Sequence, residues 1–247
     1  MNSKKVEVSF SPALFSSYYH DHQCNVVVVD IFRATSAICT AFHFGIEELI
    51  PVSTLEEAIA YKKEGYMVGA ERNGEVVEGF DFGNSPFSYM DEKIKGKRVV
   101  LTTTNGTKAI TVAKEAHSVL IGSFLNLKSL GNYLKNDGRD VLILCAGWKN
   151  RFNLEDSLFA GALVKELQGS AQFSNLADSA IAVSHLYNLA QNDLYAFLEN
   201  SSHRRRLNRL QLEDDIRFCL QQSIYTVIPV YQNGSLVNSE RFVSIEL

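Results

Sequence analysis

The sequence contains few cysteines, prolines and tryptophans, and cysteine is the residue on which disulfide-rich proteins and structural zinc sites depend. Of 247 residues, four are cysteine, four are proline and one is tryptophan. The cysteines are widely spaced and form no C-x-x-C pair, which argues against a disulfide framework and against a structural zinc site. We therefore expect reduced, buried thiols at all four positions, Cys24, Cys39, Cys145 and Cys219.

Long apolar runs and an excess of one charge are also missing. The longest purely aliphatic run, Val26 to Val29, is far too short to cross a bilayer, and no signal-peptide core follows Met1. Basic and acidic residues number 24 and 28, giving a net charge of −4 with both signs interspersed. Such a chain has no general attraction for nucleic acid or anionic lipid, so we expect neither partner, and we expect a cytoplasmic location.

What the sequence contains is typical of a globular α/β protein, with 46% apolar and 21% charged residues. Short β-branched runs alternate with helix-period segments, and their starts recur about every twenty to thirty residues, as in βα units. A run such as Val26–Val29 is apolar on both faces and must be covered on both sides. The pattern predicts a three-layer α/β/α sandwich with a mostly parallel or mixed sheet. The expected strands lie near 26–30, 46–52, 66–70, 98–102, 118–123 and 141–146.

After residue 150 the pattern changes to helices, expected roughly at 154–168, 176–198 and 208–222. Two strand-like runs follow, Tyr225–Tyr231 and Leu236–Ile245, and the Asn233-Gly234 pair between them predicts a terminal β-hairpin. Pro229 removes one ladder donor, which favours a sheet edge or a bulge for the first run. No linker interrupts the chain, so we expect a single domain over 1–247, with a second lobe from about residue 150 as the alternative.

Ligands of open α/β sheets bind beyond the carboxyl ends of the strands, so the segments that follow the strands are the candidate sites. Asp30 ends one strand, and Arg33 and Thr35 follow at a helix start, where phosphate is stabilised. A second anion site is indicated by Thr103, Thr104, Asn105 and Gly106, without the spacing of a P-loop or of a G-x-G-x-x-G motif. Ordinary helix caps and turns are the alternative in both segments.

Two further junctions carry charge. Lys149 and Arg151 are placed to face a dianion, whereas Glu155 and Asp156 fit the first turn of a helix better than they fit metal ligation. Asp30, Glu71 and Asp81 are hard oxygen ligands of the kind that Mg²⁺ prefers. The run His203–Arg206 with Arg209 favours a solvated face, and an anion-contacting edge is its alternative.

Five segments occur in the order VVVVDIFRATSAI, GFDFGNSP, TTTNGTKAI, CAGWKNRFNLEDSLFAGALV and LEDDIRFCLQQ. Together they resemble the 2-phosphosulfolactate phosphatase family across nearly the whole chain. The resemblance implies an α/β/α fold and an Mg²⁺-dependent hydrolase that converts 2-phospho-3-sulfolactate to sulfolactate and phosphate in coenzyme M biosynthesis. The sequence departs from the family pattern at two positions. Asn150 stands where glycine is common, and Arg204 stands in a stretch that often reads His-Gly-Arg-Arg. Both positions flank basic residues, so we expect them to affect substrate preference.

We therefore predict hydrolysis of a small, highly anionic phosphorylated hydroxy acid with Mg²⁺ as cofactor. Attack by metal-bound water is preferred over an aspartyl phosphate at Asp30, because Phe32 stands where the second aspartate of that motif is expected. A non-catalytic anion sensor and a phosphatase for another hydroxy-acid phosphate are the alternatives, and a homodimer stays open. The predicted roles are catalysis for Asp30, Arg33 and Arg151; substrate binding for Thr35, Asn84, Thr103, Thr104, Asn105, Gly106 and Lys149; and metal binding for Asp30, Glu71 and Asp81.

Overall fold

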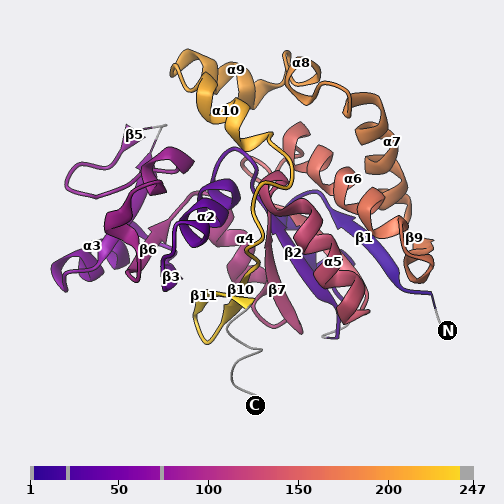
Figure 1. Ribbon diagram of the computed structural model, residues 1–247, viewed down its shortest axis with the longest axis horizontal. Coiled ribbons are helices and arrows are strands. Elements are labelled where there is room, and N and C mark those ends of the chain that lie inside the picture. The colour runs from indigo at the N-terminus through magenta and orange to yellow at the C-terminus, as the bar shows by residue number, and fades with distance from the viewer. Residues whose placement is uncertain (1–2, 21–22, 73–74, 240–247) are drawn as a thin grey trace.

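The computed structural model describes residues 3–20, 23–72 and 75–239, and its strands form a single mixed sheet (Figure 1). The order across the sheet is β5-β4-β6-β3-β11-β10-β7-β2-β8-β1-β9. The strands are β1 Lys5–Ser9, β2 Asn25–Val29, β3 Glu48–Pro51, β4 Met67–Arg72, β5 Glu75–Val76, β6 Arg98–Thr102, β7 Ser118–Gly122, β8 Val141–Cys145, β9 Asn175–Leu176, β10 Pro229–Gln232 and β11 Ser235–Asn238.

Helices connect the strands and then form most of the chain after β8. The α-helices are α1 Phe15–Tyr18, α2 Ala34–His43, α3 Leu55–Lys63, α4 Gly106–Ala113, α5 Leu127–Asp137, α6 Leu154–Gln168, α7 Asp178–Ala190, α8 Leu194–Phe197, α9 Ser202–Arg209 and α10 Glu213–Cys219. Short 3₁₀ helices cover Pro12–Leu14, Pro86–Tyr89, Glu92–Ile94, Phe124–Asn126 and Ala171–Phe173. No helix within the described residues has the length and apolarity of a membrane span.

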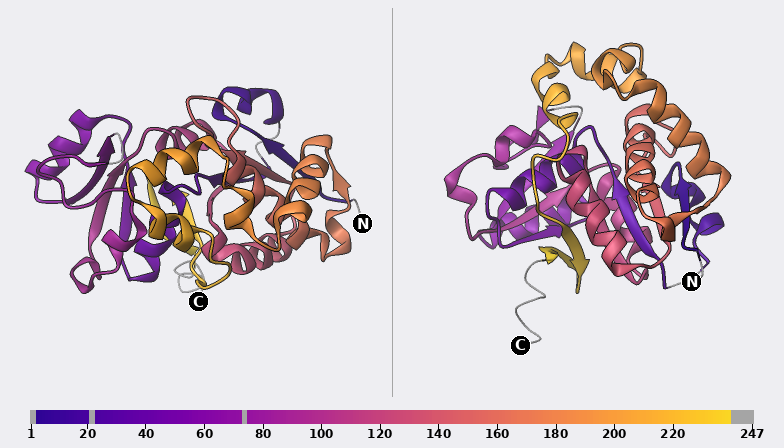
Figure 2. Two further views of the ribbon diagram at one scale, coloured as in Figure 1. Left: turned by 90° about the horizontal axis from the view of Figure 1, so that it is seen from above. Right: turned by 45° about the vertical axis from the view of Figure 1, so that its right-hand side comes forward.

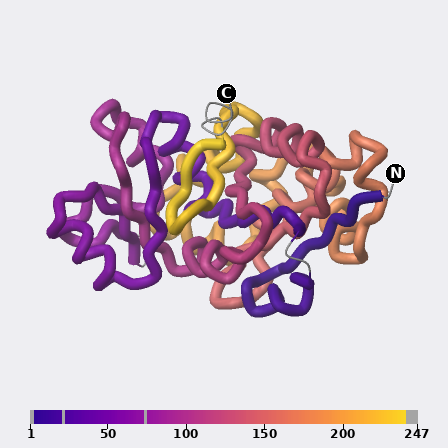
Figure 3. Tube along the Cα trace, turned by 90° about the horizontal axis from the view of Figure 1, so that it is seen from below, coloured from indigo at the N-terminus to yellow at the C-terminus, as the bar shows by residue number. Residues whose placement is uncertain are grey.

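The sheet consists of two parallel parts joined by a hairpin. Strands β7, β2, β8, β1 and β9 are parallel neighbours, and so are β3, β6 and β4. The β10–β11 hairpin lies between these parts and pairs antiparallel with β7 on one side and with β3 on the other. Figure 3 shows this hairpin in yellow between the two parts. A segment from the end of the described chain therefore completes the sheet at its centre.

Two apolar cores lie on opposite faces of the sheet, as the predicted three-layer sandwich requires. Alternate residues of β2 point to opposite faces, because side chains alternate along a strand. Val27 and Val29 pack with residues of α5, α6 and α7, whereas Val26 and Val28 pack with residues of α2 and α4. All five residues of β2 are buried, which explains its unbroken apolar sequence.

The six predicted strands and the helix at 154–168 are confirmed. The predicted helix at 176–198 is interrupted after Ala190, and Asp193 then caps α8 through the backbone N–H of Ala196. The helix predicted at 208–222 is wrong in its bounds, because Ser201 caps a helix that begins at Ser202 and α10 starts separately at Glu213. Strand β1, at the amino-terminal end of the described chain, was not expected.

The hairpin prediction is confirmed in its turn. Asn233 and Gly234 both have positive φ, at 48° and 95°, as a type I′ turn requires. The edge placement of Pro229 is wrong: Pro229 is the first residue of a central strand and pairs with Asn238, a position where a missing ladder donor is tolerated. Residues 240–245 of the predicted second run lie outside the described residues. All four cysteines are buried thiols, as expected.

Helices α9 and α10 lie across one end of the sheet, above α2 in Figure 1 and over the middle of the molecule when it is seen from above in Figure 2. The loop that leaves β2 and the first turns of α4 and α6 lie beneath them, and all of these segments follow carboxyl ends of parallel strands. Ligand sites of open α/β sheets form at such an edge. The polar residues that meet there define the candidate site.

Candidate active site

Asp30 lies at the carboxyl end of β2 and is nearly buried, with 7% exposure. Its backbone N–H donates to Thr35 Oγ1 at 3.1 Å, so the Thr35 hydroxyl fixes the turn into α2. Its carboxylate accepts the backbone N–H of Gly106, the first residue of α4. A Cβ on Gly106 would lie 3.2 Å from Asp30 Oδ2, which leaves little room for a side chain. Thr35 and Gly106 thus position Asp30.

Asp156, in the first turn of α6, links two loops of the same edge. Its Oδ1 accepts the N–H of Ile31 at 2.9 Å, and its Oδ2 accepts the N–H of Gly147 at 3.1 Å. The amide of Asn153 donates to Oδ2 as well, at 2.9 Å. The loop after β2 and the loop after β8 are therefore held together by one buried carboxylate, which agrees with the structural role that the sequence favoured for Asp156.

Glu155 is the third buried carboxylate of the group. Its Oε1 accepts from His203 Nδ1 at 2.6 Å and from the Asn153 amide at 3.1 Å. Its Oε2 is buried and has no hydrogen-bond partner among the residues that the structure describes. Because a buried carboxylate oxygen without a partner is costly, this atom marks a place where positive charge or a donor is favourable.

Burial and neighbouring acids raise the pKa values of Asp30 and Asp156. Burial is the largest cause that raises the pKa of Asp30 to about 6, and Glu155 and Glu71 add to the rise, whereas His203 opposes it. Burial, Asp30 and Glu155 together raise the pKa of Asp156 well above its ordinary value. The edge of the sheet therefore concentrates negative charge that the folded protein holds at a cost.

Arg33 is buried between two carboxylates from distant parts of the chain. Its Nη2 donates to Glu71 Oε2 at 2.5 Å and its Nη1 donates to Asp215 Oδ1 at 2.6 Å. Glu71 Oε2 also accepts the backbone N–H of Asn84 at 3.0 Å. Burial opposes the charge on Arg33, but the two carboxylates outweigh it and raise the pKa of the guanidinium. Arg33 thus joins the loop after β2 to β4 and to α10.

A small cavity of about 70 Å³ opens among these groups. Most of the residues that the sequence indicated are brought together around it. Those are Asp30, Arg33, Glu71, Asn84, Thr103, Thr104 and Asn105. Thr103 Oγ1 already accepts the N–H of Thr107, in the first turn of α4, at 3.0 Å. Among the described residues that line the cavity, Thr104 and Asn105 are therefore the side chains of this loop best placed to contact a ligand.

Four lining residues, Phe32, Trp148, His203 and Arg206, were not among the predicted site residues. His203 and Arg206 lie three residues apart on α9, hence on one face of that helix. The basic run had indicated an anion-contacting edge only as the alternative to a solvated face. The helix was expected to start later, so nothing in the sequence placed this face over Asp30.

Five predicted residues do not line the cavity. Two of them, Thr35 and Gly106, contact Asp30 as described above. Asp81 forms an ion pair with Lys62 at 2.6 Å and accepts the N–H of Val68 at 2.8 Å. Arg151 is exposed, and Lys149 Nζ lies 4.7 Å from the centre of the Trp148 ring. The roles predicted for Asp81, Arg151 and Lys149 therefore stay predictions for side chains outside this lining.

The chain is similar to proteins of one family over most of its length. The sequence model of the 2-phosphosulpholactate phosphatase family matches residues 11–234. A probable 2-phosphosulfolactate phosphatase of Thermotoga maritima is 42% identical over 214 residues, covering 87% of this chain and 92% of the relative. A protein of the same description from Caldanaerobacter subterraneus subsp. tengcongensis is 39% identical over 222 residues, covering 88% and 92%.

Replacing Asp30 by asparagine is expected to stabilise the fold above about pH 6. The pKa of Asp30 rises from 3.8 to about 6 on folding, so its ionisation opposes folding as pH rises through that window. Asp30→Asn removes this cost, and the variant should gain about 2 kcal/mol in the free energy of unfolding at pH 8 and almost none at pH 4. Urea unfolding in EDTA at the two pH values measures the difference. Asp81→Asn, whose acid is ion-paired at the surface, is the control, and a variant Asp30→Asn no more stable than the wild type at pH 8 would contradict the argument.

Replacing Arg33 by lysine should destabilise the protein. One ammonium group cannot reproduce both guanidinium contacts, so Glu71 or Asp215 loses its buried partner. We expect a loss of about 3 kcal/mol in the free energy of unfolding. The matched control is Arg98→Lys, where the arginine is 55% exposed and pairs with Glu48, with an expected change below about 0.5 kcal/mol. Equal stabilities of the two variants would show that the buried ion pairs contribute little.

Proposed function

Because the chain belongs to the 2-phosphosulfolactate phosphatase family, a family of phosphoric monoester hydrolases, we propose that it hydrolyses 2-phospho-3-sulfolactate or a close anionic analogue at the Asp30 cavity. The observation that carries the proposal is the lining of that cavity. Two carboxylates, Asp30 and Glu71, share it with the guanidinium of Arg206 and with the polar loop at the start of α4. Phosphoryl transfer depends chiefly on positioning and on neutralising charge, and these groups provide both.

The phosphate is proposed to bind against the loop that precedes α4. Thr104 and Asn105 line the cavity there and offer a hydroxyl and an amide. The amino-terminal turn of a helix adds positive partial charge, which favours a phosphate. Arg206 and His203 face this loop from α9, so cationic and donor groups reach the substrate from the opposite wall. Arg33 has a different role, because its ion pair with Glu71 orients that carboxylate.

Mg²⁺ is proposed as the cofactor, held by Asp30 and Glu71. Within the described ranges no three His, Cys, Asp or Glu side chains are grouped as a complete metal site. Mg²⁺ usually takes one or two carboxylates and fills its remaining positions with water and substrate oxygens, so two acids suit it. A cation is also favourable here because burial, together with Glu155 and Glu71, raises the pKa of Asp30, so that added positive charge stabilises its carboxylate. When bound, Mg²⁺ supplies positive charge that neutralises phosphate oxygens.

The function is tested by release of phosphate from 2-phospho-3-sulfolactate and from a panel of other phosphorylated hydroxy acids. We expect turnover of the sulfonated substrate with Mg²⁺, loss of turnover in excess EDTA, and recovery when Mg²⁺ is restored. Tight binding of these compounds without phosphate release would instead favour an anion sensor, the alternative from another class. Turnover of other members of the panel alone would assign a different hydroxy-acid phosphate as the substrate.

The metal ligands are tested separately from turnover. Mg²⁺ should raise the melting temperature of the wild type, because a ligand that binds only the folded state stabilises it. Asp30→Asn and Glu71→Gln should abolish most of this rise, whereas Asp81→Asn, whose acid pairs with Lys62, should keep it. Thermal scans in EDTA and in Mg²⁺ measure the rise for each protein. A full rise in Asp30→Asn would exclude Asp30 as a ligand.

A further inference from the structure

A second, larger cavity of about 460 Å³ opens beside the Asp30 cavity. The two share Trp148, His203 and Arg206 as lining residues, so a molecule that occupies one can extend into the other. The remaining lining residues of the larger cavity are Ser202, Arg205 and Arg209, all from α9. We call this space the arginine cavity. None of the residues predicted from the sequence lines it.

The arginine cavity carries positive charge that the described protein does not neutralise. No carboxylate lines it, and within residues 3–20, 23–72 and 75–239 no ion pair involves Arg205, Arg206 or Arg209. Four arginines elsewhere in the described structure, Arg33, Arg98, Arg139 and Arg217, do form ion pairs. Three unpaired guanidinium groups around one space raise the local concentration of anions and can bind an oxyanion through paired N–H donors.

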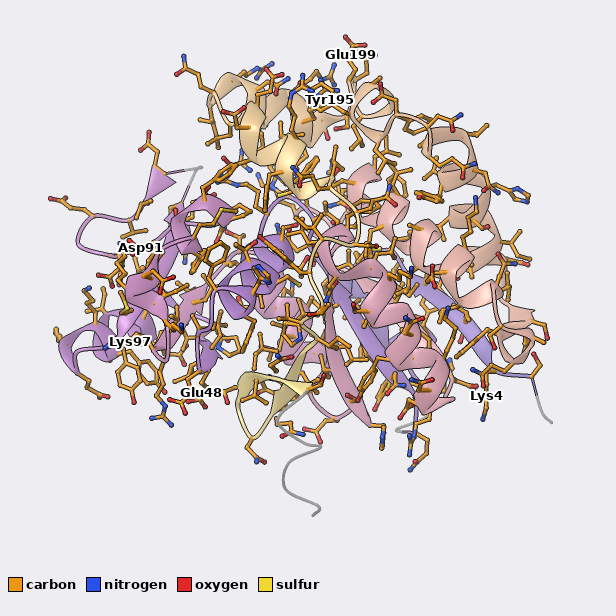
Figure 4. All side chains as sticks on the ribbon, in the orientation of Figure 1. Lys4, Glu48, Asp91, Lys97, Tyr195 and Glu199 are labelled. Carbon is orange, nitrogen blue, oxygen red and sulfur yellow. The ribbon has the colours of Figure 1, made fainter. Side chains whose placement is uncertain are left out.

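The packing of α9 explains why these arginines face the cavity. Arg204 is buried, lies 3.7 Å from the centre of the Tyr195 ring and donates to the Tyr195 carbonyl oxygen. Leu207, three residues on, is buried in the core. These two side chains fix the inward face of the helix and leave Arg205, Arg206 and Arg209 to line the cavity. Tyr195, labelled in Figure 4, lies on α8 at the top of the molecule.

Trp148 gives the cavity its other wall. The guanidinium of Arg206 lies 5.7 Å from the centre of the Trp148 ring, so it is held beside the aromatic face. Trp148 belongs to the loop after β8, whose neighbouring Gly147 is bound by Asp156. This wall of the arginine cavity is therefore held by Asp156, which also accepts the N–H of Ile31, next to Asp30.

We propose that the arginine cavity binds the sulfonate group of the substrate, with Arg205 and Arg209, which line this cavity alone, as the specificity-determining residues. This inference rests on the proposed function, because it assigns the second anionic group of a substrate whose phosphate occupies the Asp30 cavity. A sulfonate stays ionised at every physiological pH and presents three oxygens, which suits several guanidinium donors. Selectivity then comes from the second cavity, whereas the Asp30 cavity acts on the phosphate that all candidate substrates share.

Turnover of a matched substrate pair tests the assignment. 2-Phospholactate has the phosphate and the carboxylate of 2-phospho-3-sulfolactate but lacks its sulfonate. We expect Arg205→Ala and Arg209→Ala, which change the two arginines that line only the arginine cavity, to lower kcat/KM for the sulfonated substrate by about tenfold or more, since a charge-assisted contact is lost, and to leave 2-phospholactate within about twofold. Arg209→Lys should recover part of the loss. Arg98→Ala, which removes an exposed arginine that pairs with Glu48, is the control and should change neither substrate. Equal losses on both substrates would overturn the proposal.

Binding of 3-sulfolactate tests the cavity without any turnover. Trp148 is the chain's only tryptophan and lines the cavity, so its fluorescence reports on an occupant directly. We expect 3-sulfolactate to change this fluorescence in the wild type, lactate to have no effect at the same concentration, and Arg205→Ala with Arg209→Ala to weaken the response by at least about tenfold. A wild type that binds 3-sulfolactate but hydrolyses neither substrate would refute the proposed function and support the cavity. No response to 3-sulfolactate would refute the cavity, whatever the turnover.

Discussion

The buried contacts of Arg33 are the constraint on which the candidate site depends. One guanidinium, 2% exposed, binds Glu71 of β4 and Asp215 of α10, and it stands in the loop after β2. Three segments that are distant in sequence therefore meet at one charged group. Burying a charge is unfavourable unless it is paired, so none of the three can move away without leaving an unpaired charge behind. This is how the helical carboxyl-terminal part is fastened over the edge of the sheet, and it is why α9 faces Asp30.

The edge beneath Arg33 stores unfavourable electrostatic energy. Parallel strands bring their carboxyl ends together, and here the segments that follow them contribute Asp30, Glu155 and Asp156 within interaction range. Backbone N–H groups of Ile31, Gly147 and Gly106 compensate part of the repulsion, as does His203. The repulsion that is left uncompensated opposes folding. The same negative charge stabilises a cation or a protonated group that binds at this edge, because it is already in place before binding. Stability and function thus oppose each other at Asp30.

Local patterns in the sequence predict the parts of the molecule that local patterns determine. Apolar runs locate β2, β6, β7 and β8 because these strands are buried, and Asn233-Gly234 locates the hairpin turn because its backbone needs positive φ. The position of that hairpin, between two parallel parts of the sheet, follows from long-range packing that no local pattern encodes.

The residues of the candidate site also fall into those that local sequence indicates and those that only the fold brings in. Asp30 and the Thr103–Asn105 loop directly follow strands, whereas His203 and Arg206 arrive on α9 some 170 residues after Asp30. Asp81 also stands near a strand, but Lys62 engages its carboxylate, a contact that sequence alone does not show.

The two cavities give the substrate region opposite charges at opposite ends. Carboxylates line the Asp30 cavity together with cationic and donor groups, whereas unpaired arginines from α9 line the neighbouring one, and Arg206 with Trp148 belongs to both. A phosphate placed among carboxylates requires added positive charge, which is the physical reason for the divalent cation proposed at Asp30 and Glu71. A second anion placed among arginines requires none. A substrate with two separated anionic groups is therefore complementary to this edge, while a simple phosphate leaves the arginines without a counter-ion. The charges at this edge therefore favour substrates that carry anionic groups at two positions. Because Arg206 lines both cavities, binding of the second anion in the arginine cavity is linked to the position of the phosphate in the Asp30 cavity.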